Sequence, residues 1–138
     1  MKPFVALFFC LIALTGLLRA EDEFADGWTD VDKLTLEAAS PEATVITYVE
    51  HANAGDFDVC VALMTPEYIA WLDRIGGYEA SLEKYQDADL EKRFAYRVRP
   101  RDDERVQVRV RYYSVSRGRE VNVSLNVRKT AAGWKLTL

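Results

Sequence analysis

The chain has little of the chemistry from which most enzyme sites are built. It contains two cysteines and one histidine, His51, among 138 residues. Cys10 lies in an apolar N-terminal run that we interpret as a cleaved leader. Cys60 is then the one cysteine of the mature chain, so an intrachain disulfide is excluded. Cys60 falls on an apolar helix face and is expected to be a buried, unreactive thiol. A zinc site is disfavoured, and no phosphate loop or activated nucleophile is recognisable. The sequence therefore predicts no metal and no cofactor, and it identifies no reaction.

One long apolar run is present, at the N-terminus. Residues 5–18 are almost entirely apolar, Lys2 supplies a positive charge before them, and Ala20 suits a cleavage site. The run is shorter than the ~20 apolar residues of a membrane span. We interpret residues 1–20 as a secretory signal peptide, with a retained anchor as the alternative. We expect a secreted or periplasmic protein that has no membrane span after cleavage.

Charge is divided between two parts of the chain. Residues 21–91 hold 18 acidic residues against three basic ones, and residues 92–138 hold 13 basic residues against four acidic ones. The net charge of −4 hides this division, and the acidic total argues against nucleic acid as a partner. Residues 21–39 are acidic without a clear period, so we interpret them as a linker. The predicted domain then spans residues 40–138.

Two helix-start signals open this domain. Ser40-Pro41-Glu42 and Thr65-Pro66-Glu67 each combine an N-cap hydroxyl, a proline in the first turn and an acid near the positive end of the helix dipole. Gly55 and Gly76 supply stop signals. Asp56 is expected to cap a short second helix. Four helices are predicted, over residues 40–55, 56–64, 65–76 and, more weakly, 78–90.

After Lys92 the apolar residues no longer recur at helical spacing but occupy every second position. Such alternation predicts strands with one buried and one solvated face. Turn-forming residues separate the segments, as in hairpins. The predicted fold class is α+β, with N-terminal helices packed on one face of a curved four-stranded antiparallel sheet. The alternating segments are residues 94–98, 106–112, 121–127 and 134–138.

These segments resemble a known superfamily. Tyr48-Val49-Glu50-His51-Ala52-Asn53-Ala54-Gly55-Asp56-Phe57, followed by Val61-Ala62-Leu63-Met64, is similar to the opening helices of the nuclear transport factor 2-like superfamily. This is the cone-shaped α+β fold of SnoaL-like proteins and ketosteroid isomerases. Gly133-Trp134-Lys135-Leu136 resembles its last strand. The resemblance implies a sheet curled around the helices with a conical pocket between them, as in secreted bacterial members of unknown function.

The resemblance bears on catalysis through one tyrosine. In ketosteroid isomerase relatives a helix tyrosine and a strand acid stabilise an oxyanion, and an aspartate abstracts a proton. Tyr48 matches the tyrosine, but the segment that should carry the base begins a helix at Thr65, and residues 121–127 are apolar on their inward face. We expect a non-catalytic protein. The alternative is an isomerase- or hydratase-type enzyme that uses Tyr48 as hydrogen-bond donor with His51 or Asp73, although His51 also fits an exposed position at the helix rim.

Aromatic residues are the candidates for a ligand pocket. An apolar cavity with a few phenolic hydroxyls suits a small apolar ligand. The alternative is that these rings fill the core. The predicted pocket-lining residues are Tyr48, Tyr68, Trp71, Tyr96, Tyr112 and Trp134.

Arginines are the candidates for a partner surface. Five of them alternate with apolar residues, so they should lie on the outward face of neighbouring strands, where they could bind an acidic protein partner. The alternative is a solvated face neutralised by acids across the strands. The oligomeric state is not predictable, although a symmetric pairing of this face would oppose arginines with arginines. The predicted partner face comprises Arg97, Arg99, Arg109, Arg111 and Arg128.

Overall fold

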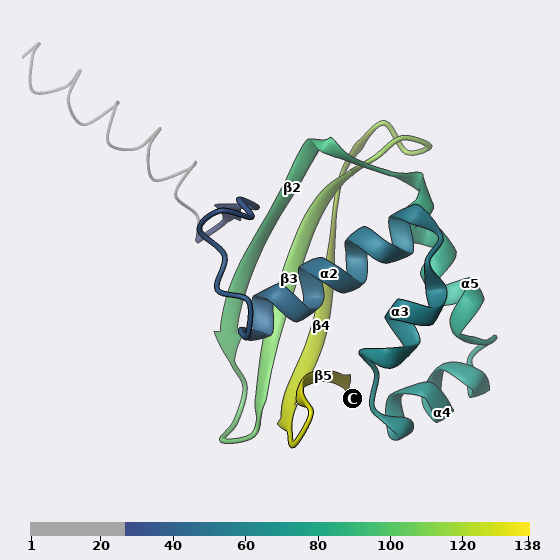
Figure 1. The fold of residues 1–138 in the computed structure, drawn as a ribbon. Helices are drawn as coiled ribbons and strands as arrows, with labels where there is room; N and C mark the ends of the chain where they lie inside the picture. Colours follow the sequence, from purple (N-terminus) through teal and green to yellow (C-terminus); the bar gives the residue numbers. More distant parts are fainter. Residues whose placement is uncertain (1–26) are drawn as a thin grey trace, which may run out of the picture.

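The computed structural model describes residues 27–138, so the predicted leader and residues 21–26 lie outside the described residues. Within them the fold is α+β, with helices packed against a five-stranded antiparallel sheet (Figure 1). The sheet order follows the sequence, β1-β2-β3-β4-β5. The elements are β1 (Thr29–Asp30), α2 (Pro41–Ala54), α3 (Phe57–Ala62), α4 (Pro66–Arg74), α5 (Tyr78–Glu83), the 3-10 helix η1 (Lys84–Asp87), β2 (Ala88–Pro100), β3 (Arg105–Ser114), β4 (Arg119–Thr130) and β5 (Gly133–Thr137).

Both helix-start signals act as predicted. The Ser40 hydroxyl oxygen accepts the backbone N–H of Ala43 at 3.2 Å and so caps α2. The Thr65 hydroxyl oxygen accepts the N–H of Tyr68 at 3.3 Å and caps α4. Gly55 ends α2 with φ of 82°, a left-handed conformation that costs glycine little. The starts of α2 and α4 are therefore capped by hydrogen bonds within their own segments.

The prediction that the Asp56 side chain caps the second helix is wrong. Asp56 stands at the N-cap position of α3, but its side chain makes no capping hydrogen bond. Its carboxylate instead lies 3.3 Å from the Nδ1 atom of His51 at the end of α2. The His51–Asp56 contact therefore joins the end of one helix to the start of the next.

The predicted fourth helix ends early. Helical geometry stops at Asp87, and strand β2 begins at Ala88 instead of near residue 94. The Asn53 side-chain amide of α2 donates to the carbonyl oxygens of Tyr85 at 2.7 Å and Ala88 at 2.8 Å. These contacts hold two carbonyls that a continuing helix would need for its own hydrogen bonds. A tertiary contact thus decides the boundary.

The four predicted strands are present, and the structure adds a fifth, so the predicted strand number is short by one. β1 lies inside the predicted linker and pairs with β2 through Thr29 opposite Tyr96 and Asp30 opposite Ala95. A strand of two residues shows no alternation, and this is why the sequence pattern misses it. β2 is also irregular, because its register with β3 shifts between Asp89 and Phe94.

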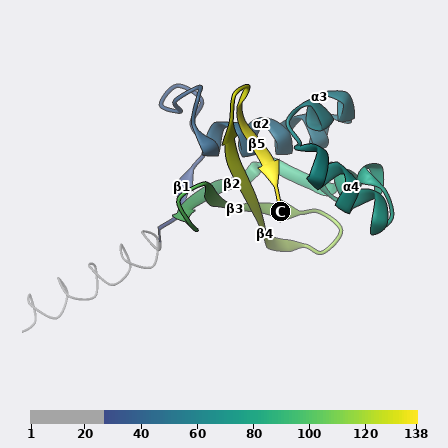
Figure 2. The same ribbon diagram turned by 90° about the horizontal axis from the view of Figure 1, so that it is seen from below.

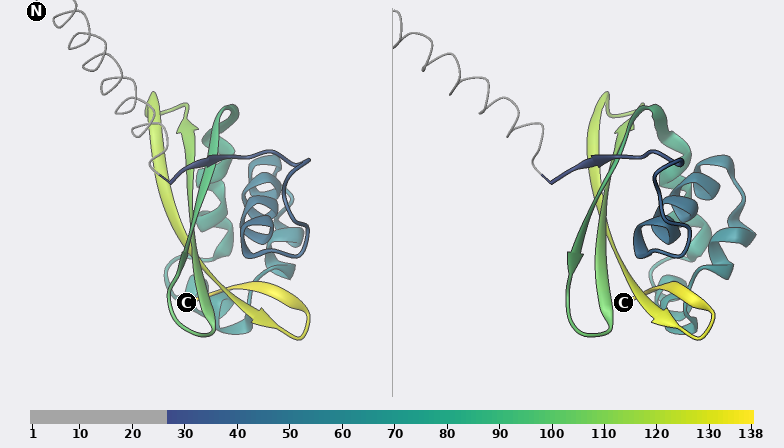
Figure 3. Two further views of the ribbon diagram at one scale, coloured as in Figure 1. Left: turned by 90° about the vertical axis from the view of Figure 1, so that its left-hand side faces the viewer. Right: turned by 60° about the vertical axis from the view of Figure 1, so that its left-hand side comes forward.

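The molecule has two layers, with the sheet on one side and the helices on the other (Figure 3). The core lies between them, where Val45 and Val49 of α2 are fully buried with Val108, Val110 and Val127 of the sheet. Seen from below, β1 and the helices α3 and α4 lie toward opposite ends of the molecule (Figure 2). None of the helices in residues 27–138 has both the length and the apolar content to cross a membrane.

The last strand ties the two layers together. Leu136 of β5 donates its N–H to the carbonyl of Leu63 at 2.7 Å, and its own carbonyl accepts the N–H of Thr65 at 2.8 Å. The Lys135 ammonium donates to the carbonyl of Ala62 at 2.7 Å. These bonds fasten the α3–α4 connection to the end of the sheet.

Candidate functional site

The strand register brings four of the five predicted arginines together on the outer face of the sheet. Arg97 of β2 stands directly opposite Arg109 of β3. Arg99 and Arg111 each lie two residues further along their strand, so they point to the same face. We call these four residues the arginine block. Arg128 lies apart, toward the far end of β4, where its guanidinium is 3.8 Å from the carboxylate of Glu67 on α4.

The neighbours of the arginine block on β4 are neutral. Asn122 pairs with Arg111 and Ser124 with Arg109 in the register. The Arg111 Nε donates to the Asn122 side-chain oxygen at 3.0 Å, and the Arg109 Nε donates to the Ser124 hydroxyl at 3.2 Å. These acceptors orient the guanidiniums without cancelling their charge. Glu120 approaches from one end, with its carboxylate 3.9 Å from the Arg111 Nε.

The first described residues lie against the arginine block. The Arg111 guanidinium carbon lies 4.2 Å from the centre of the Trp28 ring, a cation–π contact. Gly27 is so close to Arg97 that a Cβ there would lie 3.2 Å from the Arg97 Cδ. Sequence reasoning missed Trp28 as part of this surface. The available signal was a tryptophan within an otherwise acidic segment.

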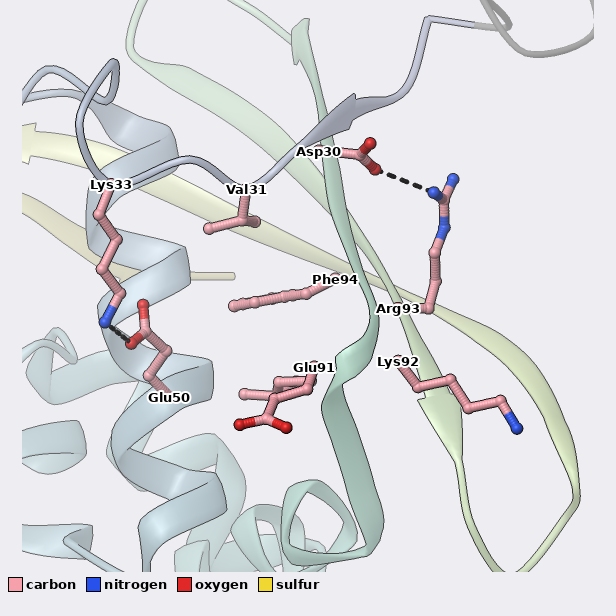
Figure 4. Close-up of a pocket in the computed structure, with 9 residues that line it drawn as sticks. Asp30, Val31, Lys33, Glu50, Glu91, Lys92, Arg93 and Phe94 are labelled. Carbon is pink, nitrogen blue, oxygen red and sulfur yellow. Dashed lines mark hydrogen bonds and ion pairs between the residues drawn. The ribbon is translucent and has the colours of Figure 1, made fainter.

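A second candidate is a cleft of about 590 Å³ between the β1 segment, α2 and the irregular part of β2. Figure 4 shows the Phe94 ring pointing into this cleft below Val31, with the Glu91 carboxylate beside it. Leu90 adds to its apolar lining. The cleft therefore combines an aromatic floor with charged walls.

Four of the six charged residues that line this cleft are paired with one another. Lys33 and Glu50 form an ion pair of 2.6 Å across it, and Arg93 reaches Asp30 at 2.9 Å (Figure 4). The Arg93 Nε is buried, lacks a hydrogen bond and lies 3.5 Å from the Glu120 carboxylate. The walls are thus held by internal pairs, which a ligand that binds one of these four residues would have to displace.

Three of the predicted pocket residues, Tyr48, Tyr68 and Tyr112, lie in the core. Tyr48 has 1% of its surface exposed. Burial raises the pKa of both Tyr48 and Tyr68. Tyr85, which sequence reasoning missed, packs between Tyr48 and Tyr112 with ring centres 5.8 Å from each. These rings fill the space between α2 and the sheet.

The other predicted pocket residues are more open. Tyr96 and Trp134 are half-buried, and Trp71 has 36% of its surface exposed. Trp71 packs against Tyr68 with ring centres 5.7 Å apart. Tyr112 also lines a cleft of about 480 Å³ beside the β3–β4 hairpin. The structure therefore spreads the six residues through the core and its margins.

The candidate reactive groups are dispersed as well. His51 is partly exposed and pairs with Asp56, whereas Tyr48 on the same helix is buried. Cys60 is fully buried, donates its thiol to the carbonyl of Tyr48 at 3.3 Å, and has its pKa raised by burial to about 11. Asp73 is exposed on α4. Across residues 27–138, His, Cys, Asp and Glu side chains form no group of three or more able to hold a metal ion.

Comparison of the chain with protein-family models, curated proteins and solved structures gave no match. The nuclear transport factor 2-like assignment therefore stays a prediction. The described geometry allows an α+β cone, since helices cover one face of an antiparallel sheet.

Proposed function

We propose that this chain is a non-catalytic binding module that docks an acidic protein partner against the arginine block. The observation that carries the proposal is the direct pairing of Arg97 with Arg109 on a face where β4 supplies neutral partners. A partner with carboxylates at this spacing would bind the arginine forks in a bidentate manner.

The tyrosine core supports this proposal over a small apolar ligand in a conical pocket. Tyr85 packs against both Tyr48 and Tyr112 in the space between α2 and the sheet. The same packing weighs against isomerase chemistry, because the Tyr48 side chain is buried and has little access to solutes. Either activity would require the core to open.

The experiment removes charge from the arginine block and compares an equal loss elsewhere. A fluorescent decamer of glutamate serves as the acidic probe, and its Kd is measured at low and at physiological salt. Replacement of Arg97 and Arg109 by Gln should weaken binding about tenfold, if each guanidinium contributes ~0.7 kcal/mol. The control variant carries Arg74→Gln and Lys129→Gln, two exposed positions outside the block. Equal weakening of both variants, or binding that is insensitive to salt, would overturn the proposal.

We also propose the finer fold and the destination of the chain. A long capped helix α2, a short α3 and then a meander of long strands support the cone-shaped nuclear transport factor 2-like fold. The apolar run at residues 5–18 supports export. N-terminal sequencing of the exported protein tests the second point, and a mature chain that still begins at Met1 would contradict it.

A further inference from the structure

The irregular part of β2 is a bulge that shapes the cleft beside α2. In the register Asp89 lies opposite Tyr113 and Phe94 lies opposite Tyr112. Because those two tyrosines are consecutive, residues 90–93 have no counterpart on β3. Bulges bend a strand, re-aim its side chains and are frequent beside binding sites. All four bulge residues line the cleft of about 590 Å³, so the irregularity forms one of its walls.

The cleft has an apolar floor that suits an organic ligand. Figure 4 shows the Phe94 ring projecting into it, with Val31 on one side and Glu91 on the other. The Val31 N–H donates to the Phe94 carbonyl at 3.0 Å, which holds the segment after β1 beside the ring. A space of several hundred Å³ that combines apolar side chains with a few polar groups is typical of small-molecule sites.

All three basic residues of the cleft lining are already engaged. The ammonium of Lys33 and the guanidinium of Arg93 are held in the two ion pairs described above. The Lys92 ammonium lies 3.8 Å from the centre of the Tyr113 ring, and Figure 4 shows this side chain directed away from Phe94. Each positive charge of the described lining therefore has a partner.

One carboxylate of the lining, that of Glu91, is left over. The other two acids, Asp30 and Glu50, belong to the same two ion pairs. Within residues 27–138 the Glu91 side chain makes no hydrogen bond or ion pair. Its carboxylate is exposed and lies beside the Phe94 ring (Figure 4). A negative charge thus adjoins an aromatic face, and both attract a cation.

We propose that this cleft binds a small primary amine that carries an aromatic or other apolar group. The ammonium donates to the Glu91 carboxylate, and the apolar group lies on Phe94 between Val31 and Leu90. The Lys33–Glu50 and Arg93–Asp30 pairs stay intact, because the ligand uses the one acid outside them. This second site goes beyond the docking function, since it selects a cation and lies apart from the arginine block.

The test titrates phenethylamine into the full chain and follows the backbone amide signals by NMR. Phenethyl alcohol is the probe of similar size that lacks the positive charge. The amine should shift the signals of residues 90–94 and bind about fivefold more tightly than the alcohol, a difference of ~1 kcal/mol. Equal affinities, or shifts that fall elsewhere in the chain, would overturn the proposal.

Two variants test the named groups against a matched control. Glu91→Gln should weaken the amine about fivefold and leave the alcohol unchanged. Phe94→Leu keeps an apolar floor but removes the aromatic face, so it should weaken the amine about two- to fivefold. Glu79→Gln removes an exposed carboxylate from α5 and should leave the affinity for both probes unchanged. Equal weakening by Glu91→Gln and Glu79→Gln would show that only net charge matters, and the site would be wrong.

The variant that carries Arg97→Gln and Arg109→Gln separates this site from the arginine block. It should bind phenethylamine as the parent does, whatever its affinity for the glutamate decamer. Loss of amine binding in that variant would mean that the amine is not held in the cleft, and it would overturn the inference.

Discussion

The two faces of the sheet come from alternate residues of the same strands, yet they differ in almost every property. On the inner face Val108 and Val110 are completely buried against the helices. On the outer face Arg109 and Arg111, which alternate with them, remain partly exposed and bind neutral side chains of β4. The contrast shows that side chains that build the core and charged side chains of the surface alternate residue by residue along β3. Substitutions of buried residues on the inner face should therefore lower the free energy of unfolding strongly. Substitutions of arginines on the outer face should change it little or raise it.

The largest effect is expected from the inner face. Leu136 is fully buried, so Leu136→Ala should lower the free energy of unfolding by about 2–5 kcal/mol, as the cavity adds to the lost transfer energy. Leu34→Ala is the matched control, because Leu34 has 96% of its surface exposed and should change stability by less than about 0.5 kcal/mol. Urea unfolding measures both. Similar losses in the two variants would break the contrast between buried and solvated positions.

A smaller, pH-dependent effect is expected where polar contacts join the layers. The Asp87 carboxylate at the end of η1 accepts the Ser114 hydroxyl at 2.6 Å and the Ser116 hydroxyl and N–H at 2.8 and 2.9 Å. These bonds, that of Ser114 first, hold the pKa of Asp87 below its ordinary value. Stability from such a group is present above the unfolded pKa of about 4 and is lost as pH falls through the lower folded value.

Asp87→Asn should therefore be less stable than the parent near neutral pH, and the gap should close below about pH 4. Urea midpoints measured at intervals from about pH 7 to about pH 2 test this. Ser114→Ala removes one of the hydrogen bonds to the Asp87 carboxylate. When Asp87→Asn is made in the Ser114→Ala variant, the pH-dependent part of the stability difference should therefore be smaller than in the parent. A gap of equal size at every pH would show that the carboxylate charge is irrelevant to the hairpin.

The smallest effect is expected on the outer face, and its sign is reversed. Arg109→Gln should raise the free energy of unfolding by about 0.2–1 kcal/mol at low salt, because it removes one of several like charges gathered on this face. The gain should fade in about 1 M salt. Arg128→Gln is the control: its pairing with Glu67 should make the variant neutral or slightly less stable. Destabilisation by Arg109→Gln at low salt would mean that the block contributes to folding after all.

Much of this architecture is encoded locally and could be predicted. The two proline-containing caps at Ser40 and Thr65 predict α2 and α4, and period-two alternation predicts β3, β4 and β5. The same alternation predicts that Arg97 and Arg109 share a face, which the register confirms. These features depend on neighbouring residues, so no tertiary information is needed.

The remainder depends on contacts between distant residues. The end of the fourth helix follows from Asn53, which lies more than thirty residues away from the carbonyls that it binds. β1 is too short to have a pattern, and Trp28 gains its role through Arg111. Alternation places a tyrosine inside but does not say whether it lines a cavity or fills one, and Tyr48 with Tyr85 fills it.

The shortness of β1 has a consequence for how the protein avoids aggregation. Among residues 27–138, β1 pairs with only two residues of the thirteen in β2, so within this part of the chain the end of β2 from Val98 to Pro100 is a sheet edge that another chain could extend. That end carries Arg99 and terminates in Pro100, which has no N–H to donate. Charge on the edge repels a second copy of the same edge. An arginine that we assign to recognition of an acidic partner would thus also hinder pairing of β2 with the same strand of a second molecule.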